Sequence, residues 1–420
     1  MKKHLLTTTA ALAMVGGTAS AQDWNVGVGG FFTQTMSYVD VSGEVDDAAG
    51  VDFDGIKLHT SAEIHFTPSI VLDNGMTFGA NVEMEAHNDG GGAYGIDETY
   101  MFISSDTLGR VVIGHENSTG YALSVGAPSV GAMGINSPSI SMYQPLIDEG
   151  ALGLGEDGVF ATPFSRQAFG SSFTEVGGNN DAARISYFTP SFSGLTVGVS
   201  YAPNGNGDVV NNGVFNTAAD NALTDIMDIG VNYSMSMGTT DITLSARYGQ
   251  GDRNGVDVDA DILADLNAIS GSTLTGLTIA DGTPTTFAVG AQAGFGAFTF
   301  GGSYAENDND LTITATDGTD DFVFEHGDNS GWSLGMSYDV AGPWSVSFTT
   351  YQGETELLGT AGGSVDIENE AYRIGASRSL GTGVNWSVYA LQSSVTGKVT
   401  SEADVSSDSM VIGTGFNLSF

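Results

Sequence analysis

The sequence predicts an all-β protein: a sixteen-stranded antiparallel β-barrel that spans a membrane, with short turns at one rim and long loops at the other. Three observations lead to this prediction. Apolar residues alternate with small or polar residues in many short segments, the connections between these segments alternate between short and long, and charges avoid the apolar parity. Period-two alternation indicates strands with one apolar face. The sorting of loops by length is typical of membrane barrels.

The first residues are expected to be removed before the barrel forms. Basic residues open the chain, an apolar stretch runs from Leu5 to Gly17, and Ala19-Ser20-Ala21 follows. This order is that of a secretory signal peptide and its cleavage site. The apolar stretch is shorter than the roughly 20 residues of a transmembrane helix. We therefore expect a signal peptide over 1–21 and a barrel over 22–420.

Each strand is placed where alternation runs for about ten residues. In the last strand, Leu418 and Phe420 share one parity, whereas Asn417 and Ser419 share the other. The predicted strands lie near 23–38, 53–67, 76–87, 97–104, 109–115, 182–190, 195–203, 225–236, 240–250, 285–294, 296–305, 330–339, 343–353, 369–379, 383–393 and 410–420.

The connection over 116–181 is the exception among the loops. It is the third long connection, it follows the fifth strand, and it exceeds the roughly 15 residues beyond which loops are usually functional or disordered. The segment contains several acids and one base, Arg166. We expect it to fold inside the barrel and narrow a pore.

Charges in the strands fall on the parity opposite the apolar residues. In the second strand, Lys57 and Glu63 alternate with Leu58 and Ile64. A basic residue on the lipid face at mid-bilayer costs about 2–4 kcal/mol, so the charged parity is expected to line a water-filled interior. If the turn Thr67–Gly75 sets the register, Lys57 faces Glu85 and His59 faces Glu83.

Composition excludes several classes of function. Acids outnumber bases 50 to 11, and the net charge of −39 argues against a nucleic-acid partner, which requires a basic face. The chain has no cysteine, which removes disulfides and thiolate chemistry. No nucleophile motif or phosphate-binding glycine loop stands out, so we do not expect an enzyme. A solute-specific channel and an acidic β-structured surface or adhesion protein remain as alternatives.

The chain resembles the general diffusion porins of the Gram-negative outer membrane, in particular those of α-proteobacteria. Thr99–Gly114 resembles the strand-turn-strand before the porin constriction loop, and Ala183–Tyr201 is similar to the hairpin after it. Phe420 resembles the terminal aromatic residue that the barrel-assembly machinery recognises. The resemblance implies a homotrimeric barrel of sixteen strands in the outer membrane, passive diffusion of small hydrophilic solutes, and an inward-folded third loop. The family often has arginine at the place of His115.

A pore selects by its diameter and by the charges that line it. We expect bases on the wall to face acids on the third loop across the constriction. With so few bases, the pore is expected to prefer cations. The wall candidates are Lys57, Arg110, His115 and Arg184, and the loop candidates are Asp148, Glu149, Glu156 and Asp157.

The external loops carry clusters of acids that suit oxygen-liganded Ca²⁺ or Mg²⁺. One cluster, Asp257, Asp259 and Asp261, is a candidate Ca²⁺ site. Divalent ions at such clusters would bridge the loops to lipopolysaccharide. The alternative is a solvated acidic surface without a bound ion.

Overall fold

The computed structural model describes most of the chain. The described residues are 23–43, 54–86, 95–132, 134, 147–148, 159–160, 181–205, 223–257, 274–319, 321–359, 364–399 and 404–420. The expected signal peptide lies outside them, as do the candidate residues Glu149, Glu156, Asp157, Asp259 and Asp261.

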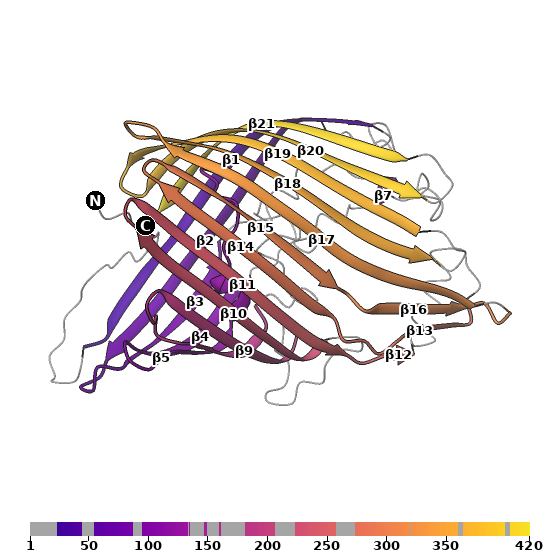
Figure 1. Ribbon diagram of the computed structural model, residues 1–420, viewed down its shortest axis with the longest axis horizontal. Helices are drawn as coiled ribbons and strands as arrows, with labels where there is room; N and C mark the ends of the chain where they lie inside the picture. Colours follow the sequence, from indigo (N-terminus) through magenta and orange to yellow (C-terminus); the bar gives the residue numbers. More distant parts are fainter. Residues whose placement is uncertain are drawn as a thin grey trace.

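The strands form one closed antiparallel barrel of sixteen strands, which confirms the predicted fold class (Figure 1). Each wall strand pairs with the next, and β21 pairs with β1. The wall strands are β1 (Asn25–Gly43), β2 (Gly55–Val71), β3 (Thr77–Glu85), β4 (Ile96–Ser105), β5 (Gly109–His115), β8 (Ala183–Phe188), β9 (Leu195–Asn204), β10 (Leu223–Met237), β11 (Thr240–Arg253), β14 (Thr285–Phe295), β15 (Phe298–Asp308), β17 (Asp321–Asp339), β18 (Trp344–Gly359), β19 (Ser364–Gly381), β20 (Val384–Val399) and β21 (Val405–Ser419).

The seam between the chain ends is closed by backbone hydrogen bonds. Tyr38 of β1 lies opposite Ile412 of β21 in the register. At the end of the seam, the Phe420 N–H donates to the Gly30 carbonyl at 3.2 Å and the Gly30 N–H donates to the Phe420 carbonyl at 3.1 Å. Closure leaves no unpaired strand edge at the seam, as a β-structure in lipid requires.

The two faces of the wall carry different residues. Ile56 and Leu58 point outward and are each 71% exposed, whereas Thr35 and Ser37 of the neighbouring strand β1 point inward and are each 1% exposed. A soluble sandwich would bury its apolar face. Here that face is on the outside, which is the arrangement of a barrel in lipid. Among the described residues, no helix is long and apolar enough to cross a membrane.

Several strands continue well beyond their predicted ends. Strand β17 begins at Asp321, although its alternation becomes clear only near Gly331. Three short strands pair beside it and extend the sheet at the long-loop end: β12 (Val256–Asp257), β13 (Gly276–Ile279) and β16 (Leu311–Thr316). Alternation continues in part of this extension, since Leu311, Ile313 and Ala315 of β16 alternate with threonines, so the predicted strand ends were placed too early.

Candidate pore-lining site

The chain after β5 turns into the barrel. The segment over residues 116–132, called the internal segment below, contains one short helix, α1 (Thr119–Leu123). The Ser118 side chain caps this helix by accepting a hydrogen bond from the Tyr121 N–H at 3.2 Å. Figure 1 shows the helix within the wall of strands, and the contacts below place the whole segment against the inner face.

The first half of the internal segment binds to β9, β10 and β11. The Thr119 N–H donates to the Ser200 Oγ of β9 at 3.3 Å. Asn232 of β10 donates through Nδ2 to the Leu123 carbonyl at 2.9 Å. The Val125 N–H then donates to the Ser245 Oγ of β11 at 3.0 Å. Each strand in turn supplies one inward polar side chain.

The second half continues around the wall. Gln292 of β14 donates to the Gly126 carbonyl at 2.8 Å. The Val130 N–H donates to the Ser347 Oγ of β18 at 3.1 Å, and the Ala132 N–H donates to the Ser387 Oγ of β20 at 3.3 Å. The internal segment therefore follows the inner face from β9 to β20. This confirms that the chain after β5 folds inward.

Glycines on the inner face make room for this path. A Cβ on Gly230 of β10 would lie 2.6 Å from the Thr119 carbonyl oxygen, and a Cβ on Gly290 of β14 would lie 1.8 Å from that of Val125. Both contacts are closer than real Cβ atoms show, and both are with backbone. At these two positions the backbone of the segment lies so close to the sheet that only glycine fits on the wall.

Arg373 of β19 is the main side-chain anchor of the internal segment. It is 0% exposed, and its NH2 donates to the carbonyls of Val130 at 2.8 Å and Ala132 at 2.6 Å. Its NH1 donates to the Ser129 Oγ at 3.0 Å and the Ser347 Oγ at 3.2 Å. Such charge-assisted hydrogen bonds are about twice as strong as neutral ones.

Three arginines on the inner face, Arg184, Arg247 and Arg373, are almost fully buried. Arg184 lies on the inner face of β8 opposite Gly114, as expected, but it is only 3% exposed, and its Nε donates to the Ala182 carbonyl at 3.3 Å. Arg247 of β11 is likewise 3% exposed, and Gly120 of the internal segment lies over its Cβ. Burial keeps both side chains largely out of contact with solvent, and the role of Arg184 at the constriction stays a prediction.

The other wall candidates differ from one another. Lys57 lies opposite the inward-facing Ser37 and is half-buried. The Arg110 guanidinium lies 4.8 Å from the centre of the Phe102 ring and 5.9 Å from that of Tyr100. Both bases are on the inner face. A cation over aromatic rings is attracted to their faces, so Arg110 is held against β4.

His115, a candidate for the pore wall, is the last residue of β5. It lies opposite Ala183, two residues from the pair Ile113 and Ile185, which are both exposed on the outer face. Alternation along β5 therefore gives His115 the outward parity. Its Nδ1 lies 3.1 Å from the Asp181 carbonyl oxygen, at the end of the strand.

The register of the β2–β3 hairpin also differs from the expected one. Strand β2 continues to Val71, and the turn forms around Gly75, which adopts a left-handed φ of 80°. Pairing is displaced as a result, so that Glu63 rather than Lys57 lies opposite Glu85. A two-strand register follows from the position of its turn, and the turn lies later in the chain than predicted.

The inner face of β2, β3 and β4 carries acids that the sequence analysis did not select. Glu98 is buried and accepts a hydrogen bond from Asn117 Nδ2 at 2.7 Å. Burial raises the pKa of the Glu116 carboxyl at the start of the internal segment above its usual range, against hydrogen bonds from Tyr100 and Asn117 that lower it. The acidic wall, as we call it below, consists of Glu63, Glu83, Glu85, Asp97 and Glu98, of which all except Glu98 are half-buried.

Two candidate residues lie in short strands of the long connections. Asp148 ends β6 (Ile147–Asp148), which pairs with β7 (Val159–Phe160) and lies against β21. Asp257 ends β12 opposite Thr278, in the extension of the sheet at the long-loop end.

The family model of the Gram-negative porins matches residues 8–397. The chain belongs to this family. No curated protein matches the sequence. As a porin, the chain is an outer-membrane β-barrel that forms a channel for solute diffusion.

Solved structures of bacterial porins share this fold. OmpT of Vibrio cholerae, in a trimer form, matches with a TM-score of 0.56 at 12% identity, over 94% of this chain and 99% of that one. The channel DcaP of Acinetobacter baumannii matches with 0.57 at 12%, over 97% and 100%. An anion-selective porin from Comamonas acidovorans matches with 0.53 at 16%, over 95% and 100%. At these identities the similarity concerns the fold.

Proposed function

We propose that this porin lets small hydrophilic solutes and ions diffuse passively across the outer membrane, and that it prefers cations. The acidic wall is the observation that carries the preference. All of its acids except Glu98 are half-buried on the inner face, whereas Arg184, Arg247 and Arg373 are nearly inaccessible. Charges that line a pore select the ions that enter it.

The distribution of basic residues also supports a preference for cations. The Arg373 guanidinium is already engaged by two carbonyl oxygens of the internal segment. Lys57 and Arg110 remain on the inner face, with Arg110 held against aromatic rings. The acids that meet pore water thus act against few accessible bases, and the local concentration of cations rises.

Reversal potentials in a KCl gradient across a planar bilayer test the preference. We expect the sign of a cation-selective pore, and anion selectivity would overturn the proposal. The double variant Glu63→Gln with Glu85→Gln should lower the cation-to-anion ratio at least about threefold, since one unit charge about 6 Å away in water contributes roughly 0.7 kcal/mol. Asp106→Asn, in the exposed turn after β4, is the matched control.

We further propose that the porin works as a homotrimer. The trimer form of the Vibrio cholerae relative, which shares the fold, supports this assembly. Each inserted trimer should then raise the conductance by one step. That conductance should later be lost in three equal parts as the three pores close. Single sublevels throughout, together with a monomer mass in detergent, would contradict the trimer.

The remaining site assignments stay part of the proposal. Lys57 and Arg110 would face loop acids across the narrowest point, and Phe420 would be the recognition residue for barrel assembly. Calcium bound by external acids, including Asp257, would bridge the loops to lipopolysaccharide. Calorimetric titration of the folded protein with Ca²⁺ tests the last point, and the absence of heat would remove it.

A further inference from the structure

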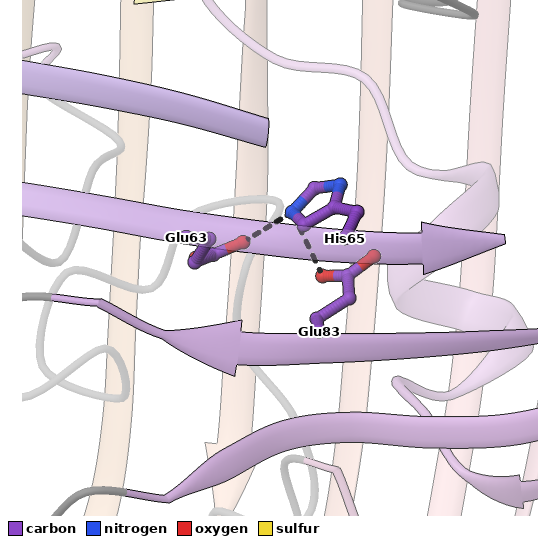
Figure 2. A group of neighbouring side chains, drawn as sticks. All are labelled: Glu63, His65 and Glu83. Carbon is purple, nitrogen blue, oxygen red and sulfur yellow. Dashed lines mark hydrogen bonds and ion pairs between the residues drawn. The ribbon is translucent and has the colours of Figure 1, made fainter. Parts of the chain in front are cut away.

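Three side chains on the acidic wall converge on one point. His65 of β2 lies opposite Glu83 of β3, and Glu63 precedes it by two residues on the same face (Figure 2). The His65 Nε2 lies 2.8 Å from the Glu63 Oε2 and 3.8 Å from the Glu83 Oε2. One ligand atom from each residue lies within 4.8 Å of the other two.

Contacts from outside the triad hold two of its members in place. The Phe31 ring meets the His65 ring edge-on, with centroids 6.3 Å apart and an interplanar angle of 85°. Asn81, which is 7% exposed, donates through Nδ2 to the Glu83 Oε1 at 2.6 Å and to the Tyr100 hydroxyl at 3.1 Å. The Glu83 Oε2 is thereby left facing His65. Hydrogen bonds of this kind orient ligands in metal sites.

The surrounding charge also calls for a cation. Glu63 lies directly opposite Glu85 in the register, and like charges in that position destabilise a sheet. Carboxylate oxygens of Glu63, Glu85 and Asp97 form a second group within 4.8 Å that shares Glu63 with the triad. A divalent ion at the triad would offset this repulsion more effectively than one imidazolium.

We propose that Glu63, His65 and Glu83 bind a divalent transition-metal ion of the zinc class on the inner wall of the pore. Ligand bonds of about 2.0–2.2 Å in a tetrahedron place ligand atoms about 3.4 Å apart, between the 2.8 and 3.8 Å that separate His65 Nε2 from the two carboxylates. Sites made only of oxygen suit Ca²⁺ or Mg²⁺, whereas an imidazole ligand favours zinc-like ions. Water would complete the coordination.

Isothermal titration of the folded, detergent-solubilised porin with ZnCl₂ and with MgCl₂ tests this site. We expect one zinc per chain, bound at least about tenfold more tightly than magnesium. His65→Gln keeps every acid and should weaken zinc binding about tenfold or more. Asp106→Asn removes one acid from the exposed turn after β4 and keeps the triad, so its zinc affinity should stay within about threefold of that of the parent protein.

Two results would overturn the proposal. Equal affinities for zinc and magnesium would show only screening by an acidic surface, and unchanged zinc binding in His65→Gln would show that the imidazole is not a ligand. Glu83→Gln provides a second ligand variant if the first does not fold. The zinc site and the cation preference are tested separately, because the reversal potential is measured in KCl without zinc.

Discussion

On β2 to β4 the inner wall presents half-exposed carboxylates, whereas from β9 to β20 it presents glycine and serine beneath the internal segment. Arg247 of β11 and Arg373 of β19 lie in the second region, beneath the internal segment. Arg373 binds protein backbone, whereas Glu63, Glu83 and Glu85 remain half-buried on the inner face. The comparison shows that lumen parity alone does not make a residue pore-lining. What covers the residue decides whether its charge acts on solutes or on the protein itself.

The largest expected effect comes from Arg373→Ala. This change removes four hydrogen bonds and leaves the Val130 and Ala132 carbonyls without their donors. Hydrogen bonds to a charged group contribute about 1.5–3 kcal/mol each, so the free energy of unfolding should fall by at least about 3 kcal/mol. Detachment of the segment should also increase current noise in single-channel records.

Arg378→Ala is the control for that experiment. Arg378 belongs to the same strand but is exposed, with its guanidinium 5.8 Å from the Trp344 ring centre. It changes the net charge equally. If the current noise and the free energy of unfolding change equally in both variants, Arg373 acts only through its charge and does not anchor the segment.

A smaller loss in the free energy of unfolding is expected from Gly290→Ala. This variant tests whether the wall glycines make room for the internal segment. The new methyl group would lie 1.8 Å from the Val125 carbonyl oxygen, so the segment or the strand has to shift. Overpacking of this kind costs about 1–3 kcal/mol. Gly381→Ala is the matched control, because its Cβ would meet no atom within 4 Å. Thermal unfolding of both variants, followed by circular dichroism, gives the comparison.

The smallest effect is expected from Ser347→Ala. Ser347 accepts hydrogen bonds from the Val130 N–H and from Arg373. Because Arg373 keeps three other acceptors, the net loss in the free energy of unfolding should be near that of one ordinary hydrogen bond, about 1 kcal/mol. Ser337→Ala changes its register partner on β17 and should be nearly neutral. If both changes lower the unfolding temperature equally, the segment does not depend on this serine.

Local signals were sufficient for the fold. Alternation at residues such as Leu418 and Phe420 and the lengths of the turns predicted the closed sheet of sixteen strands. They also placed the inward turn of the chain after β5. These signals depend only on neighbouring residues, so a single sequence contains them.

The geometry of the pore-lining site depends on contacts between residues that are far apart in sequence, which alternation among neighbouring residues does not predict. Arg373 binds a segment far away in sequence, and the glycine at 290 matters only because Val125 passes over it. The pairing of Glu63 with Glu85 required the true position of the turn near Gly75.

The seam between β1 and β21 has a consequence for biogenesis. Gly30, near the start of the barrel, bonds to Phe420 after the last wall strand, so the cylinder is sealed only when β21 is in place beside β1. Before that step the first strand has an edge that other chains could pair with. Closure of the channel therefore depends on two strands that lie at opposite ends of the barrel sequence.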